Sequence, residues 1–252
     1  MKAIAIIQAR VGSTRLPGKV MLKIMGKTIL EYGIERVKKA KNIKKVTVAA
    51  TNKKEDIVIV ELMIKLGVAV YRGSENDALD RYYQAAKQFD AKHIVRITAD
   101  CPLIDPQIID KVVRRYFKSK ADYCSNTLLE TFPDGEDVEI FNFKTLSEAW
   151  KRAKLLSERE HVTSYITKHP GKFKLVNFKN KKDLSDKRWT VDEENDFKLI
   201  KAILEALYPR NPDFQMEDVL KFLGQNPDLE NLNKDIIRNE GYLKSLREDK
   251  KV

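Results

Sequence analysis

The residues best suited to chemistry are concentrated in one loop near the start of the chain. The loop reads Arg10-Val11-Gly12-Ser13-Thr14-Arg15-Leu16-Pro17-Gly18-Lys19. Gly12 and Ser13 can turn backbone N–H groups towards an anion, because neither carries a bulky side chain. Arg15 can hold a phosphate through two parallel hydrogen bonds, and Lys19 adds a point charge. Because cations beside a leaving pyrophosphate stabilise the charge that develops on it, the loop predicts a triphosphate-binding site.

The spacing of this loop excludes two common nucleotide motifs. Gly12 and Gly18 are one residue too far apart for a Walker P-loop, and Val20 stands where that motif has serine or threonine. The glycines do not form the G-x-G-x-x-G fingerprint of dinucleotide-binding proteins either. An ordinary basic surface turn would have a similar composition, but this loop directly follows an apolar strand, which favours a ligand site.

A second candidate, Asp100, follows another apolar strand, and Pro102 stiffens the turn after it. A lone carboxylate at the end of a buried strand is well placed to hold Mg²⁺, which prefers carboxylate, water and phosphate oxygens. The competing interpretation is a helix N-cap, but Asp105, directly before Pro106, suits that role better. We therefore expect Asp100 to bind Mg²⁺ beside the triphosphate.

The elements that must position these residues alternate between strands and helices through the first half of the chain. Apolar runs predict strands at 2–8, 45–51, 68–71, 93–98 and 121–126, and amphipathic periodicity predicts helices at 28–41, 54–66, 77–89 and 106–117. This alternation indicates an α/β fold with a Rossmann-like, mostly parallel sheet and helices on both faces. Ligands bind at the carboxyl ends of such strands, so the informative loops start near Ala9, Thr51, Arg72 and Ala99.

The second half of the chain is less regular. Strands are expected at 137–141 and 173–178, and helices at 144–154, 158–168 and 195–208. Beyond Pro209 the composition becomes polar, with two further prolines and many Asn, Asp and Lys residues. We therefore expect one main domain over residues 1–209 and a small helical C-terminal tail over residues 210–252.

Charge, apolar runs and cysteine content argue against several classes of protein. The 252 residues carry a net charge of +11, but the lysines are scattered along helices with acids between them, which predicts a solvated surface and no nucleic-acid partner. No apolar run approaches the ~20 residues of a membrane span, and the N-terminus lacks a signal-peptide pattern. Cys101 and Cys124 make neither a disulfide framework nor zinc-ligand spacing. We expect a cytoplasmic protein that does not bind a membrane.

Four stretches of the chain resemble the motifs of one enzyme family. They are the loop from Gln8 to Lys19 and the segments Tyr71 to Tyr82, Arg96 to Ile104 and Arg188 to Asp192. Together they resemble the cytidylyltransferases of the acylneuraminate and 3-deoxy-manno-octulosonate type, most closely their SpsF-like branch of spore-coat polysaccharide biosynthesis. The resemblance covers residues 1–208. It implies a fold of the nucleotide-diphospho-sugar transferase type, CTP and Mg²⁺ as ligands, and a homodimer.

The resemblance also implies roles for individual residues. Arg15, Lys19 and Asp100 are expected to be catalytic, and Asp100 and Asp192 to be metal ligands, although Asp192 could instead cap a helix. The expected nucleotide-binding residues are Gln8, Ala9, Arg10, Gly12, Ser13, Thr51, Arg72, Asp77 and Asp100. The expected acceptor-binding residues are Asn126, Asp134, Glu139, Arg159, His161 and Arg188.

The acceptor itself is left open by these motifs. Enzymes for ulosonic acids in the resembled superfamily usually carry a Gly-Asp pair where this chain has Ala99-Asp100. A carboxylated sugar, a phosphorylated small molecule and a phosphonate all fit, so we expect CMP transfer from CTP to an anionic acceptor. One alternative is a glycosyltransferase that uses a sugar nucleotide, although Arg15 and Lys19 suit a leaving pyrophosphate better. The other is a polyanion-binding protein without catalysis.

Overall fold

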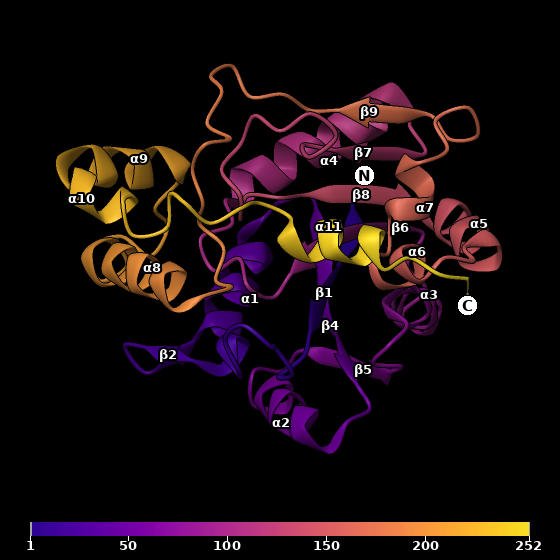
Figure 1. The fold of residues 1–252 in the computed structure, drawn as a ribbon, viewed down its shortest axis with the longest axis horizontal. Coiled ribbons are helices and arrows are strands. Elements are labelled where there is room, and N and C mark those ends of the chain that lie inside the picture. Colours follow the sequence, from indigo (N-terminus) through magenta and orange to yellow (C-terminus); the bar gives the residue numbers. More distant parts are fainter. Residues whose placement is uncertain (1, 252) are drawn as a thin grey trace.

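The computed structural model describes residues 2–251, and its centre is a seven-stranded sheet with the order β5-β4-β1-β6-β8-β7-β9 (Figure 1). The strands are β1 (Ala3–Ala9), β4 (Ile43–Thr51), β5 (Ala69–Gly73), β6 (His93–Thr98), β7 (Tyr123–Ser125), β8 (Glu139–Asn142) and β9 (Leu175–Asn177). The first four are parallel, and β9 is parallel to β7, whereas β8 is antiparallel to both β6 and β7. The expected mostly parallel sheet is confirmed. A small hairpin, β2 (Lys23–Ile24) and β3 (Lys27–Thr28), lies outside it.

Helices cover both faces of this sheet, as expected. They are η1 (Lys19–Met21), α1 (Ile29–Lys39), η2 (Lys54–Asp56), α2 (Ile57–Lys65), α3 (Ala78–Gln88), α4 (Pro106–Ser119), α5 (Phe143–Arg152), α6 (Leu156–Glu160), α7 (Ser164–Thr167) and α8 (Glu194–Leu207). Ile6 and Ile7 are neighbours on β1 and point to opposite faces. Ile7 packs into a core cluster with residues of α1, α4 and α8, and Ile6 packs into a second cluster with residues of α3, α5 and α7.

Local sequence signals explain where several helices begin. Thr28 and Glu31 form a capping box at the start of α1, in which each side chain accepts a hydrogen bond from the other residue's backbone N–H. Asp105 caps α4 by accepting from Gln107 N at 2.6 Å, with Pro106 in the first turn. The N-cap expected at Asp105 is therefore confirmed, and Asp100 is left free for another role.

The prediction of a single helix at 158–168 is wrong. The chain forms α6 and α7 instead, and residues 161–163 between them leave helical geometry. Val162 adopts a φ of 23° and is fully buried. The interruption buries Val162 in the core and leaves His161, which lines a cavity, partly exposed. Other element boundaries differ from expectation by a few residues, as β8 and β9 show.

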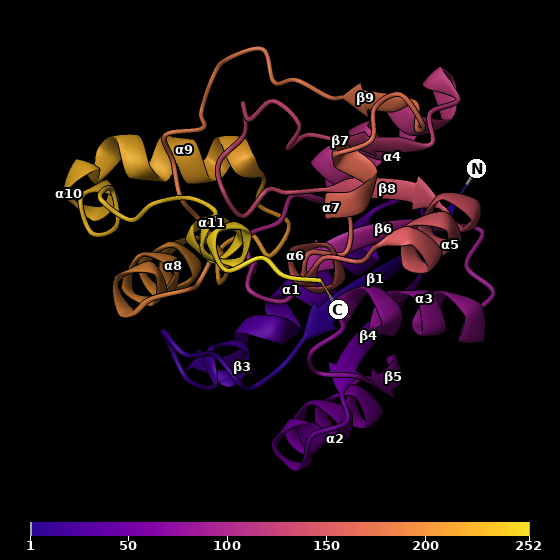
Figure 2. The same ribbon diagram turned by 45° about the vertical axis from the view of Figure 1, so that its right-hand side comes forward.

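The region beyond residue 209 is helical, as expected, with α9 (Met216–Gln225), α10 (Pro227–Glu230) and α11 (Glu240–Arg247). Met216, Val219 and Leu223 of α9 pack into the same core cluster as β1 and α1. From α10 the chain returns across the molecule, and Figures 1 and 2 both place α11 beside α6.

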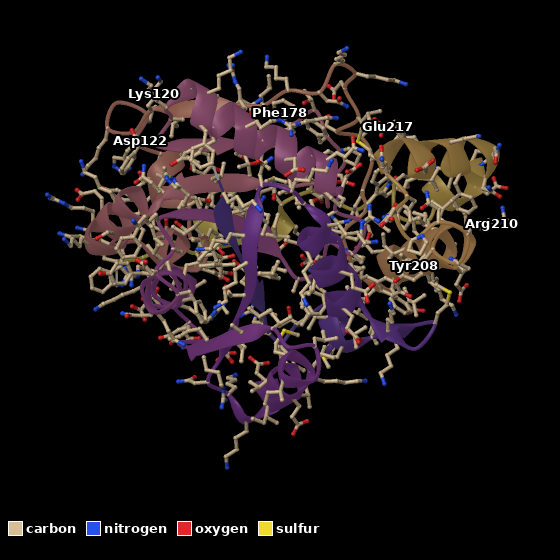
Figure 3. The ribbon with its side chains drawn as sticks, turned by 180° about the vertical axis from the view of Figure 1, so that it is seen from behind. Lys120, Asp122, Phe178, Tyr208, Arg210 and Glu217 are labelled. Carbon is tan, nitrogen blue, oxygen red and sulfur yellow. The ribbon has the colours of Figure 1, made fainter. Side chains whose placement is uncertain are left out.

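The surface is rich in charged side chains, which project from the ribbon on every side in the view from behind (Figure 3). Lys120 and Arg210 mark opposite edges of this view. Among residues 2–251, no helix is both long enough and apolar enough to span a membrane.

Candidate functional site

Lys19 holds two carboxylates that are far apart in the sequence. Its Nζ donates to Asp100 Oδ2 at 2.6 Å and to Asp192 Oδ1 at 2.5 Å. Gly18, directly before η1, adopts a φ of 70°, in the left-handed region that favours glycine, and so turns Lys19 into the helix. Asp100 follows β6, and Asp192 precedes α8. The basic loop and both expected metal ligands therefore meet at one ammonium group.

The two carboxylate-bearing segments are also joined through Asp100 O. Val191 N donates to this oxygen at 2.9 Å, and Thr190 Oγ1 donates to it at 3.3 Å. Because Thr190 and Val191 are buried, these bonds fix the spacing of the two carboxylates before any ligand arrives.

Burial and ion pairing oppose each other at these groups. Burial raises the pKa of Asp100, but the charge and hydrogen bond of Lys19 outweigh burial and lower the pKa to about 2. Burial lowers the pKa of Lys19, but Asp100 and Asp192 outweigh it and raise the pKa above its ordinary value. Lys19 and Asp100 are therefore both charged at neutral pH.

Asp56, the last residue of η2, joins the basic loop to the end of β4. Its Oδ1 accepts from Val11 N at 2.6 Å, and its Oδ2 accepts from the backbone and hydroxyl of Thr51. Asp56 is only 1% exposed, so these bonds are shielded from water. Thr51 therefore supports the loop through Asp56, and no sequence motif pointed to this aspartate.

The first cavity, called here the loop cavity, measures about 470 Å³ and lies against the basic loop. The expected nucleotide-binding residues on its wall are Gln8, Ala9, Arg10, Gly12, Ser13 and Asp100. Within residues 2–251, the wall is built without Thr51, Arg72 and Asp77. Arg72 donates to the backbone oxygens of Thr51 and Lys53, and Asp77 caps α3.

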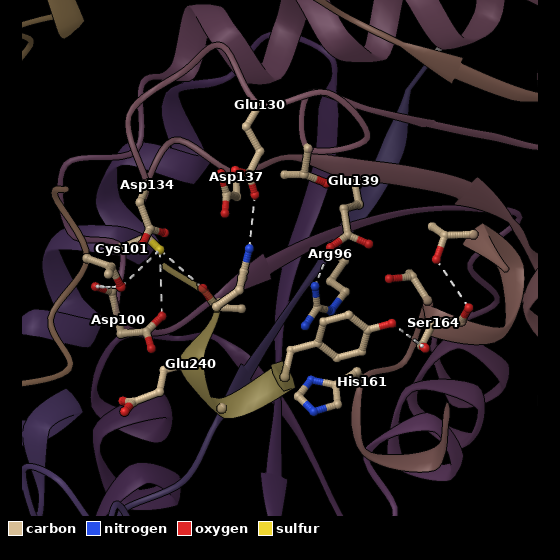
Figure 4. Close-up of a pocket in the computed structure, with 18 of the residues that line it drawn as sticks. Arg96, Asp100, Cys101, Glu130, Asp134, Asp137, Glu139, His161, Ser164 and Glu240 are labelled. Carbon is tan, nitrogen blue, oxygen red and sulfur yellow. Dashed lines mark hydrogen bonds and ion pairs between the residues drawn. The ribbon is translucent and has the colours of Figure 1, made fainter. Parts of the chain in front are cut away.

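The second cavity, called here the carboxylate cavity, measures about 490 Å³ and meets the first at Arg15, Asp100 and Asp192. Asp134, Glu139 and His161 of the expected acceptor-binding set line it (Figure 4).

Arg96 lies opposite Glu139 on the wall of this cavity (Figure 4). The Nη1 of Arg96 donates to Glu139 Oε1, and Tyr123 donates to the other carboxylate oxygen at 3.1 Å. The Nε of Arg96 is buried and has no partner within residues 2–251.

The other three expected acceptor-binding residues lie outside this wall, within the described part of the chain. Asn126 is buried, and its amide bonds the backbone at Glu136 and Val138. Arg159 pairs with Asp77. Arg188 binds three aspartates. The contacts of these three residues are structural, and their contact with a substrate stays a prediction.

Arg188 organises the carboxylates around the site. Its guanidinium donates to Asp134 at 2.7 Å and to Asp192 and Asp196 at 3.0 Å. Gly135 makes this arrangement possible, because it adopts a φ of 105° and passes close to another chain segment. A Cβ on Gly135 would lie 2.7 Å from the carbonyl carbon of Trp189, a distance that side chains do not tolerate.

The α11 segment, residues 238–251, forms part of the wall of both cavities. Glu240 accepts from Arg15 Nη1 at 3.0 Å, and Tyr242 meets the hydroxyl of Ser164 at 3.1 Å. Asp249 accepts from both the backbone and the hydroxyl of Ser157. None of the side chains of α11 is buried, so polar contacts hold this segment in place.

Several residues of the site were missed by sequence reasoning. Arg96 had a signal, because a charged residue interrupts an otherwise apolar strand, but it was given no role. Asp137 lies in the segment Pro133 to Glu139, which the resemblance places at the acceptor, and it lines the carboxylate cavity beside Arg238, which donates to it at 2.7 Å. Burial raises the pKa of Asp137 to about 7, although Arg238 opposes this change. Glu240 and Tyr242 lie in a polar tail whose sequence pattern indicates only helix.

Comparison with known proteins agrees with the geometry. Residues 4–236 match the family model described as Cytidylyltransferase. The chain is 43% identical to an uncharacterized protein of Methanocaldococcus jannaschii over 96% of this chain and 98% of that protein. It is 32% identical to the spore coat polysaccharide biosynthesis protein SpsF of Bacillus subtilis, over 88% and 94% of the two chains. A solved cytidylyltransferase from Leptospira borgpetersenii is 36% identical, with a TM-score of 0.86 over 91% and 97% of the two chains.

Proposed function

The chain belongs to the cytidylyltransferase family and is a CTP-dependent nucleotidyltransferase. From that premise we propose that it transfers CMP from CTP, with Mg²⁺, to an anionic sugar acid and releases pyrophosphate. The observation that carries the proposal is the position of Lys19, whose ammonium group lies between the carboxylates of Asp100 and Asp192. Arg15 and Lys19, the expected pyrophosphate ligands, meet these carboxylates at the junction of the two cavities.

The donor atoms at this position fit Mg²⁺. Two carboxylates already approach one cation, the ammonium group of Lys19. Mg²⁺ is often held by one or two carboxylates, with phosphate and water oxygens completing its shell. Asp100 and Asp192 would hold the ion, and the bound ion would supply positive charge at the α-phosphate. Lys19, which lies beside the same two carboxylates, would bind a phosphate oxygen.

In the proposed reaction a hydroxyl oxygen of the acceptor, which loses its proton to water, attacks the α-phosphorus of CTP in line. The new bond joins this oxygen to phosphorus, and the bond from phosphorus to the bridging oxygen breaks, so that pyrophosphate leaves. Arg15 and Lys19 stabilise the charge on the leaving group, and the backbone N–H of Gly12 can orient the phosphates. The N–H of Ser13 donates to Val11 O at 2.8 Å in this structure. No protein nucleophile is needed, because positioning and electrostatics supply most of the acceleration in such transfers.

The carboxylate cavity supports an acceptor that combines an acid with several hydroxyl groups. Arg96, whose Nε has no partner among residues 2–251, can donate to the acid. Asp134, Asp137, Glu139 and Ser164 line the cavity and can accept hydrogen bonds from hydroxyl groups. A sugar acid has this composition, and the SpsF relative is named for polysaccharide biosynthesis. The homodimer and the cytoplasmic location expected from the sequence remain predictions.

Pyrophosphate release tests the proposal. We would supply each of the four nucleoside triphosphates with a panel of sugar acids, phosphorylated alcohols and phosphonates, with Mg²⁺ or with excess chelator. We expect release only with CTP, Mg²⁺ and a sugar acid. Release with a phosphorylated alcohol or phosphonate alone would overturn the acceptor class, and full activity in chelator would overturn the metal.

A further inference from the structure

The α11 segment lies over the junction of the loop cavity and the carboxylate cavity. Gly241 lines both cavities, as do Arg15, Asp100 and Asp192. Within the segment, Asn239, Glu240 and Tyr242 line the carboxylate cavity, whereas Lys244, Ser245 and Glu248 line the loop cavity. Because the proposed transfer takes place at this junction, α11 lies where it would shield the reacting atoms from water.

The start of the segment has the features of a hinge. The side chain of its first residue, Arg238, is only 14% exposed and donates to Asp137 at 2.7 Å, so this end is anchored. Asn239 follows with a φ of 59°, and residues at the ends of elements are those that absorb the backbone rotation of a hinge. From Glu240 to Arg247 no side chain is buried, so the helix can move without exposing a hydrophobic core.

Polar contacts hold the rest of the segment against α6. Ser245 Oγ donates to Glu160 Oε2 at 2.8 Å, and Asp249 accepts from Ser157 Oγ at 2.7 Å. Hydrogen bonds of this kind replace bonds to water, so each contributes little net stability. The segment can therefore open and close at a low cost in free energy.

Glu240 and Lys244 lie one turn apart on α11 and carry opposite charges. Glu240, labelled in Figure 4, accepts from Arg15 Nη1 at 3.0 Å, and Arg15 is an expected ligand of the pyrophosphate. Lys244 is exposed and lines the loop cavity. A triphosphate along the basic loop would therefore repel Glu240 from Arg15 and attract Lys244.

We propose that α11 is a lid over the reaction centre and that a bound triphosphate closes it, because the contact of Glu240 with Arg15 is exchanged for a contact of Lys244 with phosphate. The lid rests on the proposed function in one respect, the position of the triphosphate along the basic loop. It goes beyond that function, because residues 240–247 lie outside the segment 4–236 that matches the family model. The closed lid would keep water from the α-phosphorus, so that CMP passes to the acceptor.

Hydrogen exchange of the α11 amides, followed by mass spectrometry, measures whether the lid is open or closed. In the free protein α11 should exchange faster than α8, which buries Ile200 and Ile203. With Mg²⁺ present, we expect CTP at a concentration that calorimetry shows to be saturating to slow exchange in α11 about threefold, the range of one exposed ion pair. CMP, which lacks the β- and γ-phosphates, should leave this exchange unchanged.

Lys244→Met removes the proposed contact with phosphate. We expect this variant to bind CTP about threefold more weakly, and saturating CTP should no longer slow exchange in α11. The matched control is Lys221→Met, which makes the same change at an exposed position on α9 outside the lining of both cavities, and it should behave as the wild type. Melting curves check that both variants are folded.

The proposal is overturned if CTP leaves exchange in α11 unchanged or speeds it, or if Lys244→Met gains the same protection as the wild type. Exchange that is as slow in α11 as in α8 of the free protein would overturn it too, because the segment would then be part of the rigid core. These experiments contain no acceptor, so a failure of transfer to a sugar acid would leave their outcome unchanged. Calorimetry would detect a failure of CTP to bind, which would overturn the lid and the CTP-dependent function together.

Discussion

The basic loop at residues 10–19 and the α11 segment border the same cavities, but they are held in different ways. Asp56, which is 1% exposed, anchors the loop at Val11, and the Lys19 side chain is only 13% exposed. The α11 segment buries no helical side chain, and Glu240 is 55% exposed. Charges that act on the phosphates are therefore fixed in advance, whereas the opposite wall is held by contacts that can open at low cost.

The largest expected effect tests the basic loop through Asp100, the partner of Lys19. Asp100→Asn removes a carboxylate from the pair around Lys19, and we expect turnover to fall by about a thousandfold. Lys19 loses one of its two carboxylate partners but keeps Asp192, so the melting temperature should fall while the fold stays intact. Pyrophosphate release and circular dichroism measure the two effects. Activity within tenfold of the wild type would contradict the role of Asp100.

The next effect concerns stability on the same side. Arg188→Met leaves Asp134, Asp192 and the fully buried Asp196 without their shared cation, and we expect a loss of about 3–5 kcal/mol in the free energy of unfolding. The neighbouring Lys187 pairs with Glu230 nearer the surface, so Lys187→Met should cost less than about 1 kcal/mol. Urea denaturation compares the two. Equal losses would mean that the Arg188 network is no stronger than a surface pair.

A smaller effect tests the α11 segment, which exposed contacts hold in place. Glu240 neutralises Arg15 where we expect the triphosphate, so Glu240→Gln should bind CTP about threefold more tightly, the range of an exposed ion pair. The control is Glu61→Gln, which makes the same charge change at an exposed position on α2. Calorimetric titration of CTP measures both variants. Weaker binding by Glu240→Gln alone would show that Glu240 supports the ligand.

The smallest expected effect is on the pH dependence of the unfolding free energy, and it concerns Asp137, which lines the carboxylate cavity. The pKa of Asp137 in the folded protein, about 7, lies above the ordinary value of about 3.9. The folded state therefore retains a proton that the unfolded state loses, and this contribution to stability is complete below pH ~4 and disappears as the pH rises to about 7. Asp137→Asn should therefore reduce the fall in unfolding free energy between pH 5 and pH 8, measured by urea denaturation. An equally steep fall in the variant would show that another group titrates.

The parts of the site that the sequence predicts are those where one short segment carries the chemistry. The basic loop and Asp100 follow the neighbouring parallel strands β1 and β6, so their meeting at the carboxyl ends of these strands follows from strand order. Asp192 was expected there only from the resemblance to the family. The sheet itself is predictable because buried parallel strands read as apolar runs, as Val46 to Thr51 do in β4.

The parts that the sequence does not predict depend on pairing across long separations. Arg96 meets Glu139 because β8 runs antiparallel beside β6, and no local pattern announces that pairing. His161 takes its position because the helix breaks at Val162, a β-branched residue in a conformation that it rarely adopts. Glu240 reaches Arg15 from 225 residues away. The amphipathic pattern of α11 is equally compatible with packing elsewhere on the surface, so the sequence does not predict this contact.

The separation of Arg15 and Glu240 in the sequence also determines the order in which the cavity walls can form during synthesis. Every strand of the sheet precedes α11 in the sequence, and chains grow from the N-terminus at about 5–20 residues per second. The sheet and the paired carboxylates can therefore fold while the residues of α11 have not yet been synthesised. For a few seconds the nascent chain on the ribosome would have its phosphate-binding loop folded but would lack the cavity wall that α11 forms. Docking of α11 onto α6 would then close the wall of both cavities.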